Sequence, residues 1–460
     1  MVQIATCLGF VVVLIDVSVV NVALDSLRAV FRANVTGLQW VVNAYALVFA
    51  SSLLMAGALG DRFGTKRVFM AGYAMFMLAS IGCGIAQSLE ALLAWRLVQG
   101  VGASLLVPNS LAILRLAFED PAARGRAIGW WGAGGGIALA AGPVIGGLLV
   151  TAFGWRSIFL VNVPVGIVGL WLTWRFAPGI EAQRDRNLDV PGQLTGALML
   201  AALTYALTEA SALGWKNPVI LGALALSLAS GIAFMRLEAR NPGAMLPPTL
   251  WRNRTVLSTT GIGMILNLVF YGVVFTLSLL FQTIWHTTPV STGVAFLPMM
   301  GILMAMNIVA GRLANRISAR ALATAGMLIS AMGYLAMIPA LAAQSHWVLA
   351  LPMLLAGSGV ALTIPTITHA MLAAVGSAQS GIASGLLNAG RQIGGVMGVA
   401  LFGFFVRHTE RAPFMHGIEQ ALATSALLLL AGAAIAMRNL NTATEPARQS
   451  MAIRKLKADV

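Results

Sequence analysis

Long apolar runs, separated by short polar connections, make up most of this chain. Taking about 20 apolar residues as one membrane crossing, the pattern predicts fourteen spans. We expect them at roughly 4–24, 38–59, 68–88, 91–115, 127–150, 157–175, 191–212, 218–235, 256–284, 292–311, 321–343, 347–374, 382–406 and 421–437. The pattern therefore indicates an all-α integral membrane protein with about 14 transmembrane helices.

The composition and the distribution of charge agree with this interpretation. The chain is 58% hydrophobic and 10% charged, with a mean hydropathy of +0.85. A net charge of +14 would suggest nucleic acid in a soluble protein, but here the basic residues lie in the connections between spans. With a cytoplasmic N-terminus, 21 of the 29 Lys and Arg lie on the inner side, 6 on the outer side and 2 within spans. We therefore expect both termini in the cytoplasm, the lipid bilayer as a partner, and no nucleic acid.

Several chemistries are not expected from this chain. It opens directly into an apolar run, with neither a basic segment nor a small-residue cleavage site, so we expect no removable signal peptide. Cys7 and Cys83 lie in different predicted spans, and neither a disulfide nor a metal site is expected. No lysine follows a glycine as a P-loop requires, the four being Lys66, Lys216, Lys455 and Lys457. Transport would then draw on an ion gradient, with no cofactor.

Two internal repeats divide the chain. A glycine pattern over 125–147 recurs at 381–403, a shift of 256 residues, and GALGDRFGTKR (57–67) resembles GRLANRISAR (311–320), a shift of 254. Similar shifts for two separate patterns indicate a duplicated half, as in many secondary transporters. We expect an N-terminal six-helix bundle (1–176), a linker with an inserted helix pair (177–255), a C-terminal six-helix bundle (256–438) and a cytoplasmic tail (439–460).

The stretch GWWGAGGGIALAAGPVIGGLL (129–149) is rich in glycine and carries no charge. Each interior glycine would cost a soluble helix about 1 kcal/mol relative to alanine, whereas small residues in a bilayer let neighbouring helices approach closely. Proline removes one backbone donor and can bend the helix. We expect a tightly packed, kinked span that acts as a hinge, and its candidate residues are Gly129, Gly142, Pro143, Gly146 and Gly147.

Ionisable groups inside the spans are the candidates for proton coupling. Asp16 lies in the middle of the first span, where an ionised carboxylate costs about 2.5–3.5 kcal/mol on insertion scales. Arg96 of the fourth span should lie at a similar depth. A carboxylate subject both to burial and to a nearby guanidinium can gain and lose a proton, although a permanent Asp16–Arg96 ion pair that joins the two spans is the alternative. Glu209, near the outer end of the seventh span, is a weaker candidate and suits an interfacial carboxylate. For Arg391 we expect a structural role, in contact with Asn388 and Gln392.

Two further groups of residues point to a transport mechanism. The turn between the second and third spans combines glycines, an acid and bases at a spacing too particular for a loop that only fixes orientation, and its residues are Gly57, Asp61, Arg62, Gly64, Lys66 and Arg67. Within it, Gly57 is expected to allow close helix contact and Asp61 to accept hydrogen bonds from the start of a helix. Polar, aromatic and methionine side chains could line a central substrate cavity. The candidates are Trp40, Asn43, Tyr45, Gln99, Asn109, Phe281, Gln282, Met300, Met304 and Asn388.

With these residues in place, the chain resembles the major facilitator superfamily, and in particular its fourteen-helix drug:proton antiporters of the EmrB/QacA type. The similarity covers nearly the whole length. The motifs that carry it are GALGDRFGTKR, RLVQGVG with Arg96, Gln99, Gly100 and Gly102, the 129–147 stretch ending in AGPVIGG, LIDVSVVNVAL, WRSIFLVNVPVG (155–166) and GIASGLLNAGRQIGG (381–395). Two positions differ from the usual pattern, since Ala138 replaces a glycine and Asp25 stands where proline is common.

The resemblance implies proton-coupled export of small hydrophobic, often cationic, compounds by alternating access in the bacterial cytoplasmic membrane, with a role in antibiotic resistance. It suggests Asp16 as the proton carrier, the loop around Asp61 as a latch and Gly142–Pro143 as the hinge. No acid lies in spans 9 through 14, where some relatives that take dications carry one, so a preference for dications is in doubt. Whether a membrane-fusion partner takes part is left open.

Other functions remain as alternatives. Within transport, the chain could be a dedicated exporter or a proton-coupled importer of a single metabolite. A membrane-embedded enzyme would need clustered catalytic groups, and the sequence contains no HExxH, no pair of intramembrane aspartates and no Ser/His pair at a suitable depth. A purely structural scaffold would have no need of a carboxylate such as Asp16 in its centre. We therefore expect a transporter and not an enzyme.

Overall fold

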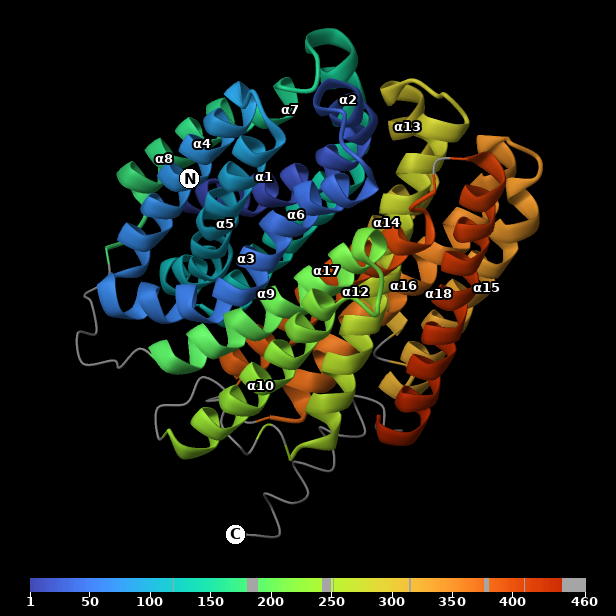
Figure 1. Ribbon diagram of the computed structural model, residues 1–460. Helices are drawn as coiled ribbons and strands as arrows, with labels where there is room; N and C mark the ends of the chain where they lie inside the picture. The colour runs from blue at the N-terminus through green and yellow to red at the C-terminus, as the bar shows by residue number, and fades with distance from the viewer. Residues whose placement is uncertain are drawn as a thin grey trace.

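The computed structural model describes residues 1–118, 120–179, 189–241, 250, 252–313, 316–375, 380–408 and 410–440, and all of its regular elements there are helices (Figure 1). The first part of the chain forms α1 (Val2–Val22), α2 (Leu24–Phe31), α3 (Val35–Phe63), α4 (Thr65–Ile85), α5 (Leu89–Ala117), α6 (Pro121–Phe153), α7 (Ser157–Leu160) and α8 (Asn162–Phe176). Two more helices follow, α9 (Val190–Leu213) and α10 (Pro218–Arg240). The last part forms α12 (Arg254–Leu279), the π-helix η1 (Leu280–Ile284), α13 (Pro289–Ala295), α14 (Leu297–Leu313), α15 (Ala319–Leu341), α16 (His346–Ala373), α17 (Ser380–Phe405) and α18 (Arg411–Asn439).

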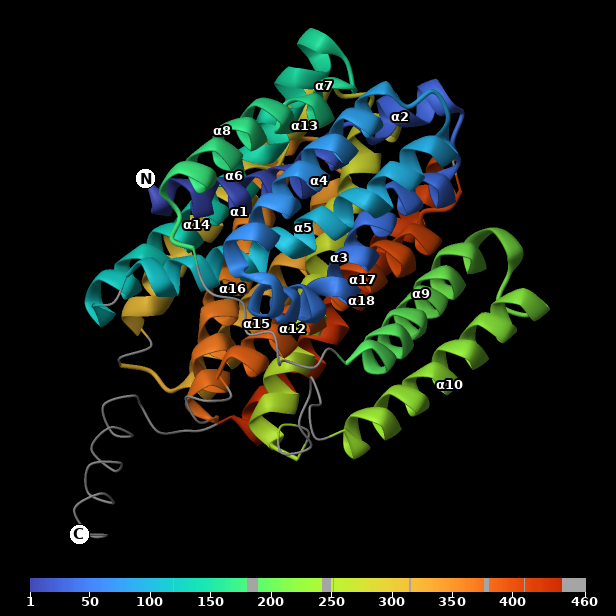
Figure 2. The same cartoon turned by 90° about the vertical axis from the view of Figure 1, so that its left-hand side faces the viewer.

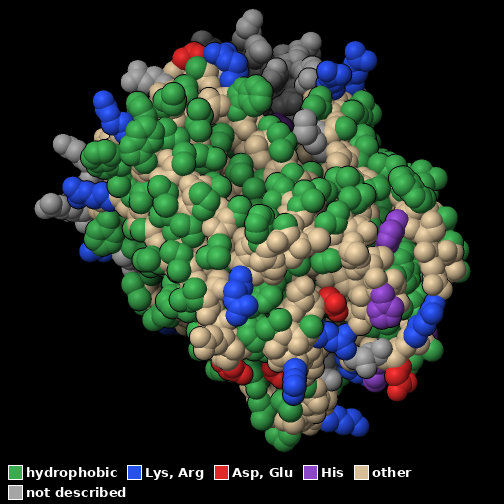
Figure 3. Space-filling view, turned by 90° about the horizontal axis from the view of Figure 1, so that it is seen from above, with side chains coloured by type: hydrophobic (Ala, Val, Ile, Leu, Met, Phe, Trp, Pro, Cys, Tyr) green, Lys and Arg blue, Asp and Glu red, His purple; other side chains and the backbone are tan. Residues whose placement is uncertain are grey.

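These helices confirm the predicted membrane architecture. Among the described residues, 11 helices are long and apolar enough to cross a membrane, or up to 13 if each of two bent helix pairs forms one span. α17, which has 26 residues, packs against α12 and α3 and takes the place of the remaining expected span. Hydrophobic side chains cover broad areas of the surface in Figure 3, and exposed apolar residues include Trp130, Leu148 and Trp171. The protein is an all-helical, multi-pass membrane protein.

Short polar residues set the helix ends. The side chains of Asn34, Ser88 and Asp120 accept hydrogen bonds from the backbone of the first turn of α3, α5 and α6, respectively. Such caps satisfy backbone donors that a helix leaves without partners. Between α3 and α4 the chain turns at Gly64, whose φ of 95° is in a region that favours glycine. The connection between α3 and α4 is therefore this single residue.

Three elements were not expected from the sequence. The amphipathic α2 follows α1 and buries Leu24 and Leu27, and α12 continues into the π-helical turn η1. α18 begins at Arg411, about three helical turns before the expected start of its span at 421. Its first turns bury Phe414 and Ile418 while Glu419 is exposed, so a one-sided pattern extends this helix beyond its continuous apolar run.

The helices assemble into two groups with a third pair beside them. α1, α3, α4, α5, α6 and α8 pack on one another, as do α12 and α14–α18. α9 and α10 pair with each other and stand to one side of the molecule, with α9 against α3 and α17 (Figure 2). The assignment of 1–176, 177–255, 256–438 and 439–460 as separate units stays a prediction, and residues 180–188, 242–249 and 441–460 lie outside the described part of the chain.

The two sides of the bundle differ in charge and in packing. We call the side on which α3 ends and α4 begins the basic side, because Arg62, Lys66 and Arg67 lie there, and the other side the opposite side. On the opposite side the two groups meet in what we call the seal, formed by Gln39, Gly147, Gln282 and Gly293. Gly147 packs against Pro289 of α13, while Gly293 packs against Pro143 of α6, so that a Cβ at either glycine would collide with backbone.

Two glutamines complete the seal. Gln39 Nε2 donates to the carbonyl oxygens of Val399 and Ala400 in α17, at 3.0 and 2.8 Å. Gln282 Nε2 donates to the Asn21 carbonyl oxygen at 3.2 Å, and its Oε1 accepts from the Asp25 N–H at 3.3 Å. Carbonyl oxygens near the ends of α17 and α1 thus accept hydrogen bonds from side chains of the other group of helices. The structure is closed on its opposite side.

Candidate functional site

A buried ion pair between α1 and α5 forms the centre of the first group of helices. Asp16 and Arg96 are 0% and 1% exposed, and Asp16 Oδ2 lies 2.5 Å from Arg96 Nη1. Sequence reasoning had proposed that these two side chains meet, and the structure brings them together. Removing two charges from water is costly unless they pair and their remaining polar atoms are bonded. The rest of the site supplies those bonds.

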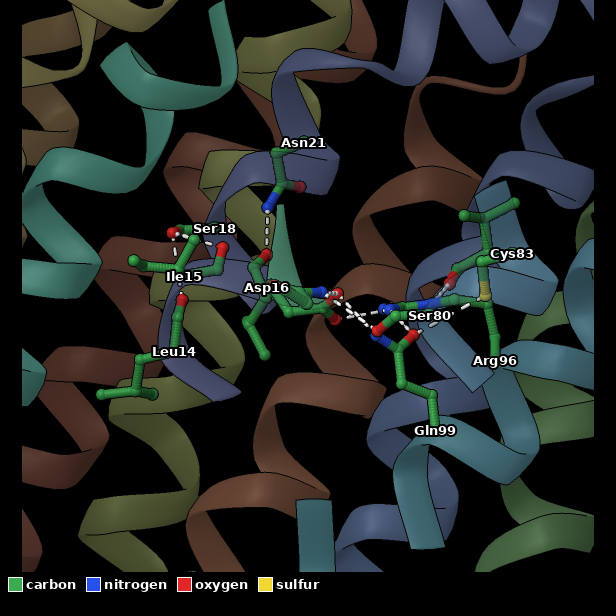
Figure 4. A network of polar contacts seen from close by, with 12 residues as sticks. Leu14, Ile15, Asp16, Ser18, Asn21, Ser80, Cys83, Arg96 and Gln99 are labelled. Atoms are coloured by element: carbon green, nitrogen blue, oxygen red, sulfur yellow. Dashed lines mark hydrogen bonds and ion pairs between the residues drawn. The ribbon is translucent and has the colours of Figure 1, made fainter. Parts of the chain in front are cut away.

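Uncharged side chains surround the carboxylate, and Figure 4 shows Ser80 and Gln99 beside it. Asp16 Oδ1 accepts from Gln99 Nε2 at 2.8 Å and from Asn162 Nδ2 at 3.0 Å. Ser80 Oγ in turn accepts from both amides, at 2.9 and 3.2 Å. The site therefore joins α1, α4, α5 and α8 through one carboxylate. Sequence reasoning missed Ser80 and Asn162, although Asn162 lies in a quoted motif as a polar residue inside an apolar run.

The guanidinium of Arg96 is held by α3 as well. Its Nε donates to the Val41 carbonyl oxygen at 3.1 Å, and its Nη1 donates to Gln99 Oε1 at 2.8 Å. The Tyr45 ring lies 4.4 Å from the Arg96 Cζ, in a cation–π contact. Both charges are thus fixed in orientation and shut away from solvent. A proton that reached Asp16 would remove one charge from a fully bonded buried pair.

The glycine-rich α6 packs on the helix that carries Asp16. A Cβ at Gly142 would collide with Ser18, and one at Gly146 would lie 3.0 Å from the Val19 Cβ. The close packing expected along this stretch is not found at Gly129, where no described atom of another element lies within 4 Å of a placed Cβ, and its part in a hinge stays a prediction. α6 runs through Pro143 as one helix of 33 residues. The close contacts of α6 with α1 begin at Gly135, where a Cβ would collide with Phe10, and continue through Gly142 and Gly146 toward the opposite side.

The latch loop lies at the basic side, where Asp61 and Arg62 end α3. Lys66 Nζ donates to the carbonyl oxygens of Trp174 and Ala177 at 3.0 and 2.8 Å, near the end of α8. Arg62 stacks on the neighbouring Phe63 ring, and Arg67 is exposed. A lysine at a helix C-terminus interacts favourably with the helix dipole.

One expected contact of this loop needs correction. At Gly57 a Cβ would lie 4.0 Å from Pro108, which is ordinary van der Waals contact. The close approach occurs at Gly60, where a Cβ would collide with the Asn109 side chain. Asn109 donates to the Ala56 carbonyl oxygen at 3.1 Å and is 1% exposed. It joins α5 to α3 in this conformation, and its place in a substrate cavity stays a prediction.

Glu209 lies beside α3 and away from the ion pair. Its Oε1 accepts from Trp40 Nε1 at 2.8 Å, and Asn43 donates to Thr208 Oγ1 at 3.4 Å. Trp40 also lies near Tyr205 of α9. These contacts attach α9 to α3, so Trp40 and Asn43 hold the inserted pair in place.

The other cavity candidates occupy several different places. Tyr45 and Gln99 are 1% and 0% exposed and belong to the ion-pair site, while Phe281 and Met300 are buried and Gln282 belongs to the seal. In this conformation packing or a hydrogen bond accounts for each of them, and their assignment to a substrate cavity stays a prediction. Asn388 is exposed, and the side chain of Met304 lies outside the described residues.

Comparison with known proteins agrees with this architecture. The model of the Major Facilitator Superfamily matches residues 6–399. The chain is 36% identical over 434 residues to the methylenomycin A resistance protein of Streptomyces coelicolor, covering 94% of this chain and 91% of that protein. It is 35% identical over 419 residues to the multidrug resistance protein Stp of Mycobacterium tuberculosis, covering 91% and 78%.

A solved structure shares the fold. The crystal structure of a D-xylose–proton symporter matches with a TM-score of 0.70 at 13% identity, covering 96% of this chain and 97% of that one. At this identity the match shows the fold alone. The family is one of transporters and not of enzymes, and the relatives reported above are drug-resistance proteins, in agreement with the EmrB/QacA resemblance. With its family model matched over residues 6–399 and its helices arranged as in a solved transporter, the chain belongs to the Major Facilitator Superfamily.

Proposed function

We propose that the protein exports small hydrophobic drug-like molecules across the bacterial cytoplasmic membrane in exchange for protons. Relatives that are more than 30% identical over most of both chains are drug-resistance proteins. The excess of Lys and Arg at the basic side supports a cytoplasmic location for that side. In this orientation the conformation described above is closed toward the outside.

The single observation that carries the proton coupling is the position of Asp16 on α1. The same helix places Ser18 against Gly142 of α6 and the Asn21 carbonyl oxygen against Gln282 of the seal. A change in the charge of Asp16 alters its bond to Arg96 and acts on a helix that also contacts the hinge and the seal. In our proposal, proton binding and opening of the seal are linked through α1.

Alternating access follows from this link. With the seal closed, substrate binds from the cytoplasm between the two groups of helices. When the seal opens and the basic side closes, substrate leaves to the outside and a proton reaches Asp16. Return to the present conformation releases the proton to the cytoplasm. The latch loop and the basic-side half of α6, open at Gly129, would meet the second group when the basic side closes.

Everted membrane vesicles with an acid interior test this proposal. Candidate compounds come first from a growth-inhibition panel of dyes, antiseptics and antibiotics in an efflux-deficient host. A compound against which the protein protects should, on addition to vesicles, release protons and partly dissipate the pH gradient, and it should not do so with Asp16→Asn. Transport that continues with ATP after the gradient is abolished would contradict the proposal. Protection against one compound class only would indicate a dedicated exporter.

A further inference from the structure

The second group of helices carries a charge that the ion-pair site does not explain. No aspartate or glutamate occurs between Glu238 and Glu410, so the whole of α12 to α17 lacks an acid. Arg391 lies within this region, eleven residues after the start of α17 at Ser380. At 1.5 Å per residue it lies about 17 Å along the helix, near the middle of a hydrocarbon core of about 30 Å. An arginine at this depth is rare and usually functional.

Two asparagines are the described hydrogen-bond partners of Arg391. Its Nε donates to Asn267 Oδ1 at 3.4 Å, and its Nη1 donates to Asn388 Oδ1 at 3.5 Å. Both distances are long for hydrogen bonds of a charged donor, which are usually 2.7–2.9 Å. Tyr271 of α12 is the described titratable group that acts on it electrostatically. The guanidinium, with five donors, therefore holds donors in reserve and has no carboxylate among its described partners.

The position of Asn388 shows which way this cluster faces. Asn388 and Arg391 are three residues apart and share one face of α17. Asn388 is exposed, and an exposed amide at mid-membrane depth faces water, since lipid would leave it without partners. Asn267 is 4% exposed and lies behind the guanidinium on α12. The cluster thus faces the space between the two groups of helices.

We propose that Arg391, with Asn267 and Asn388, binds a carboxylate or another anionic oxygen group of the exported substrate. The reason lies in the transport cycle, and the inference rests on the proposed function. In the present conformation Arg391 is partly exposed, so water can reach the guanidinium. When the basic side closes around substrate that water is displaced, and an unpaired guanidinium in a dry site is very costly. A substrate oxygen that accepts two hydrogen bonds from the planar guanidinium replaces the lost water.

This assignment changes the expected substrate class. The resemblance to drug:proton antiporters implied substrates that are often cationic, but the described interior of the second group is positive. A dication would meet Arg391 with no acid nearby to offset it, whereas a hydrophobic acid would be attracted. It also replaces the structural role that the sequence suggested for Arg391.

A matched pair of fluorescent probes tests the proposal without any gradient. The probes are pyrenebutyrate and pyrenebutyl-trimethylammonium, which share one apolar ring system and differ in the charge at the end of the chain. Binding is measured by fluorescence titration on the purified full-length protein in lipid nanodiscs. We expect the carboxylate probe to bind more tightly by about tenfold or more, as one charge-assisted hydrogen-bonding group allows. Equal binding, or tighter binding of the ammonium probe, would overturn the proposal.

Two variants assign the preference to this cluster. Asn388→Asp adds a carboxylate beside Arg391 Nη1 at an exposed, nearly isosteric position, and should abolish or reverse the preference. Arg391→Met should abolish it, while Arg391→Lys should keep part of it. Arg407→Met, on an exposed arginine that stacks on Phe404, is the control and should bind as wild type does. An unchanged preference in a folded Asn388→Asp variant refutes the proposal. If the probe preference is present but no proton release is seen in vesicles, the coupling mechanism fails and the subsite stands.

Discussion

Two arginines lie inside the membrane part of this protein, and they are held in opposite ways. Arg96 is 1% exposed, has an acid at 2.5 Å, and donates in addition to a carbonyl and an amide oxygen. Arg391 is partly exposed and has two amides at 3.4 and 3.5 Å. The first charge is neutralised before any ligand arrives, and the second is not. A buried ion pair such as Asp16–Arg96 can hold two helices together and can change when the carboxylate binds a proton. A charge without an acidic partner, such as that of Arg391, is suited to binding an anionic ligand.

The largest expected effect comes from removing the charge of Asp16, the ion-pair partner of Arg96. Asp16→Asn keeps the size of the side chain and an oxygen that Arg96 can bond, so the variant should insert and still bind substrate. It should not concentrate substrate against its gradient, because the titrating group is gone. Uphill export in vesicles, normalised to membrane abundance, measures this. Full uphill export by a well-expressed Asp16→Asn variant would remove Asp16 from the mechanism and leave Glu209 as the remaining candidate.

Stability should separate the two arginines next. Arg96→Met leaves the Asp16 carboxylate buried without its counter-charge, a loss of about 3–5 kcal/mol for a buried pair. Arg391→Met removes two long hydrogen bonds and leaves no buried charge without its partner, so its cost should be much smaller. Membrane abundance and thermal unfolding in nanodiscs compare them. Equal losses for the two variants would contradict the difference that we draw. An apolar double replacement of Asp16 and Arg96 that restores abundance would favour a purely structural pair.

A change in the packing of α6 against α1, the helix that carries Asp16, should give a smaller effect. Gly142→Leu forces a side chain onto Ser18, two residues from Asp16, and such overpacking costs about 1–3 kcal/mol. Transport should slow by roughly 5- to 150-fold if that cost falls on one conformation. Gly129→Leu is the matched control in the conformation with the closed seal, because the Cβ position of Gly129 is open there. Probe binding should therefore be retained in this variant. Normal transport by a well-inserted Gly142→Leu variant would show that this contact has no part in the cycle.

Lys66 offers a third, intermediate kind of cation, bonded to helix-end carbonyls and partly in contact with solvent. Lys66→Met should cost about 0.3–1 kcal/mol, the usual range for a charge at a helix end. We expect a small drop in thermal stability. Added salt should reduce the difference between wild type and the variant, because it screens the charge of Lys66 in the wild type. A loss as large as that of Arg96→Met would mean that the loop bears more than this one contact.

The sequence predicted the membrane architecture well because a span requires a long apolar run, and the runs are unmistakable. The Asp16–Arg96 contact was predictable for a similar reason, since two opposite charges at equal depth in a bilayer have few alternatives to each other. Ser80 and Asn162 were missed because a single polar residue in a span gives no sign of which neighbour it faces.

Other features depend on which conformation the chain adopts. Gln282 and Phe281 read as cavity residues by type, yet the first bonds across the seal and the second packs behind it. The glycines of α6 look alike in sequence, but a Cβ at Gly142 would collide with Ser18, whereas a Cβ at Gly129 would meet no described atom of another element within 4 Å. Composition shows that close approach is allowed along the helix. Which part of it is in contact depends on how the two groups of helices are tilted.

The seal has an electrical consequence. Its four members, Gln39, Gly147, Gln282 and Gly293, carry no net charge. A unit charge that crosses the full membrane potential changes its energy by about 2.3 kcal/mol per 100 mV, but separating amides and glycines moves no such charge. Voltage across the membrane therefore exerts no direct pull on the seal. In our proposal, voltage acts on the cycle through the proton on Asp16 and through the charge that the substrate brings to Arg391, so the voltage sensitivity of export would report the charge of the substrate.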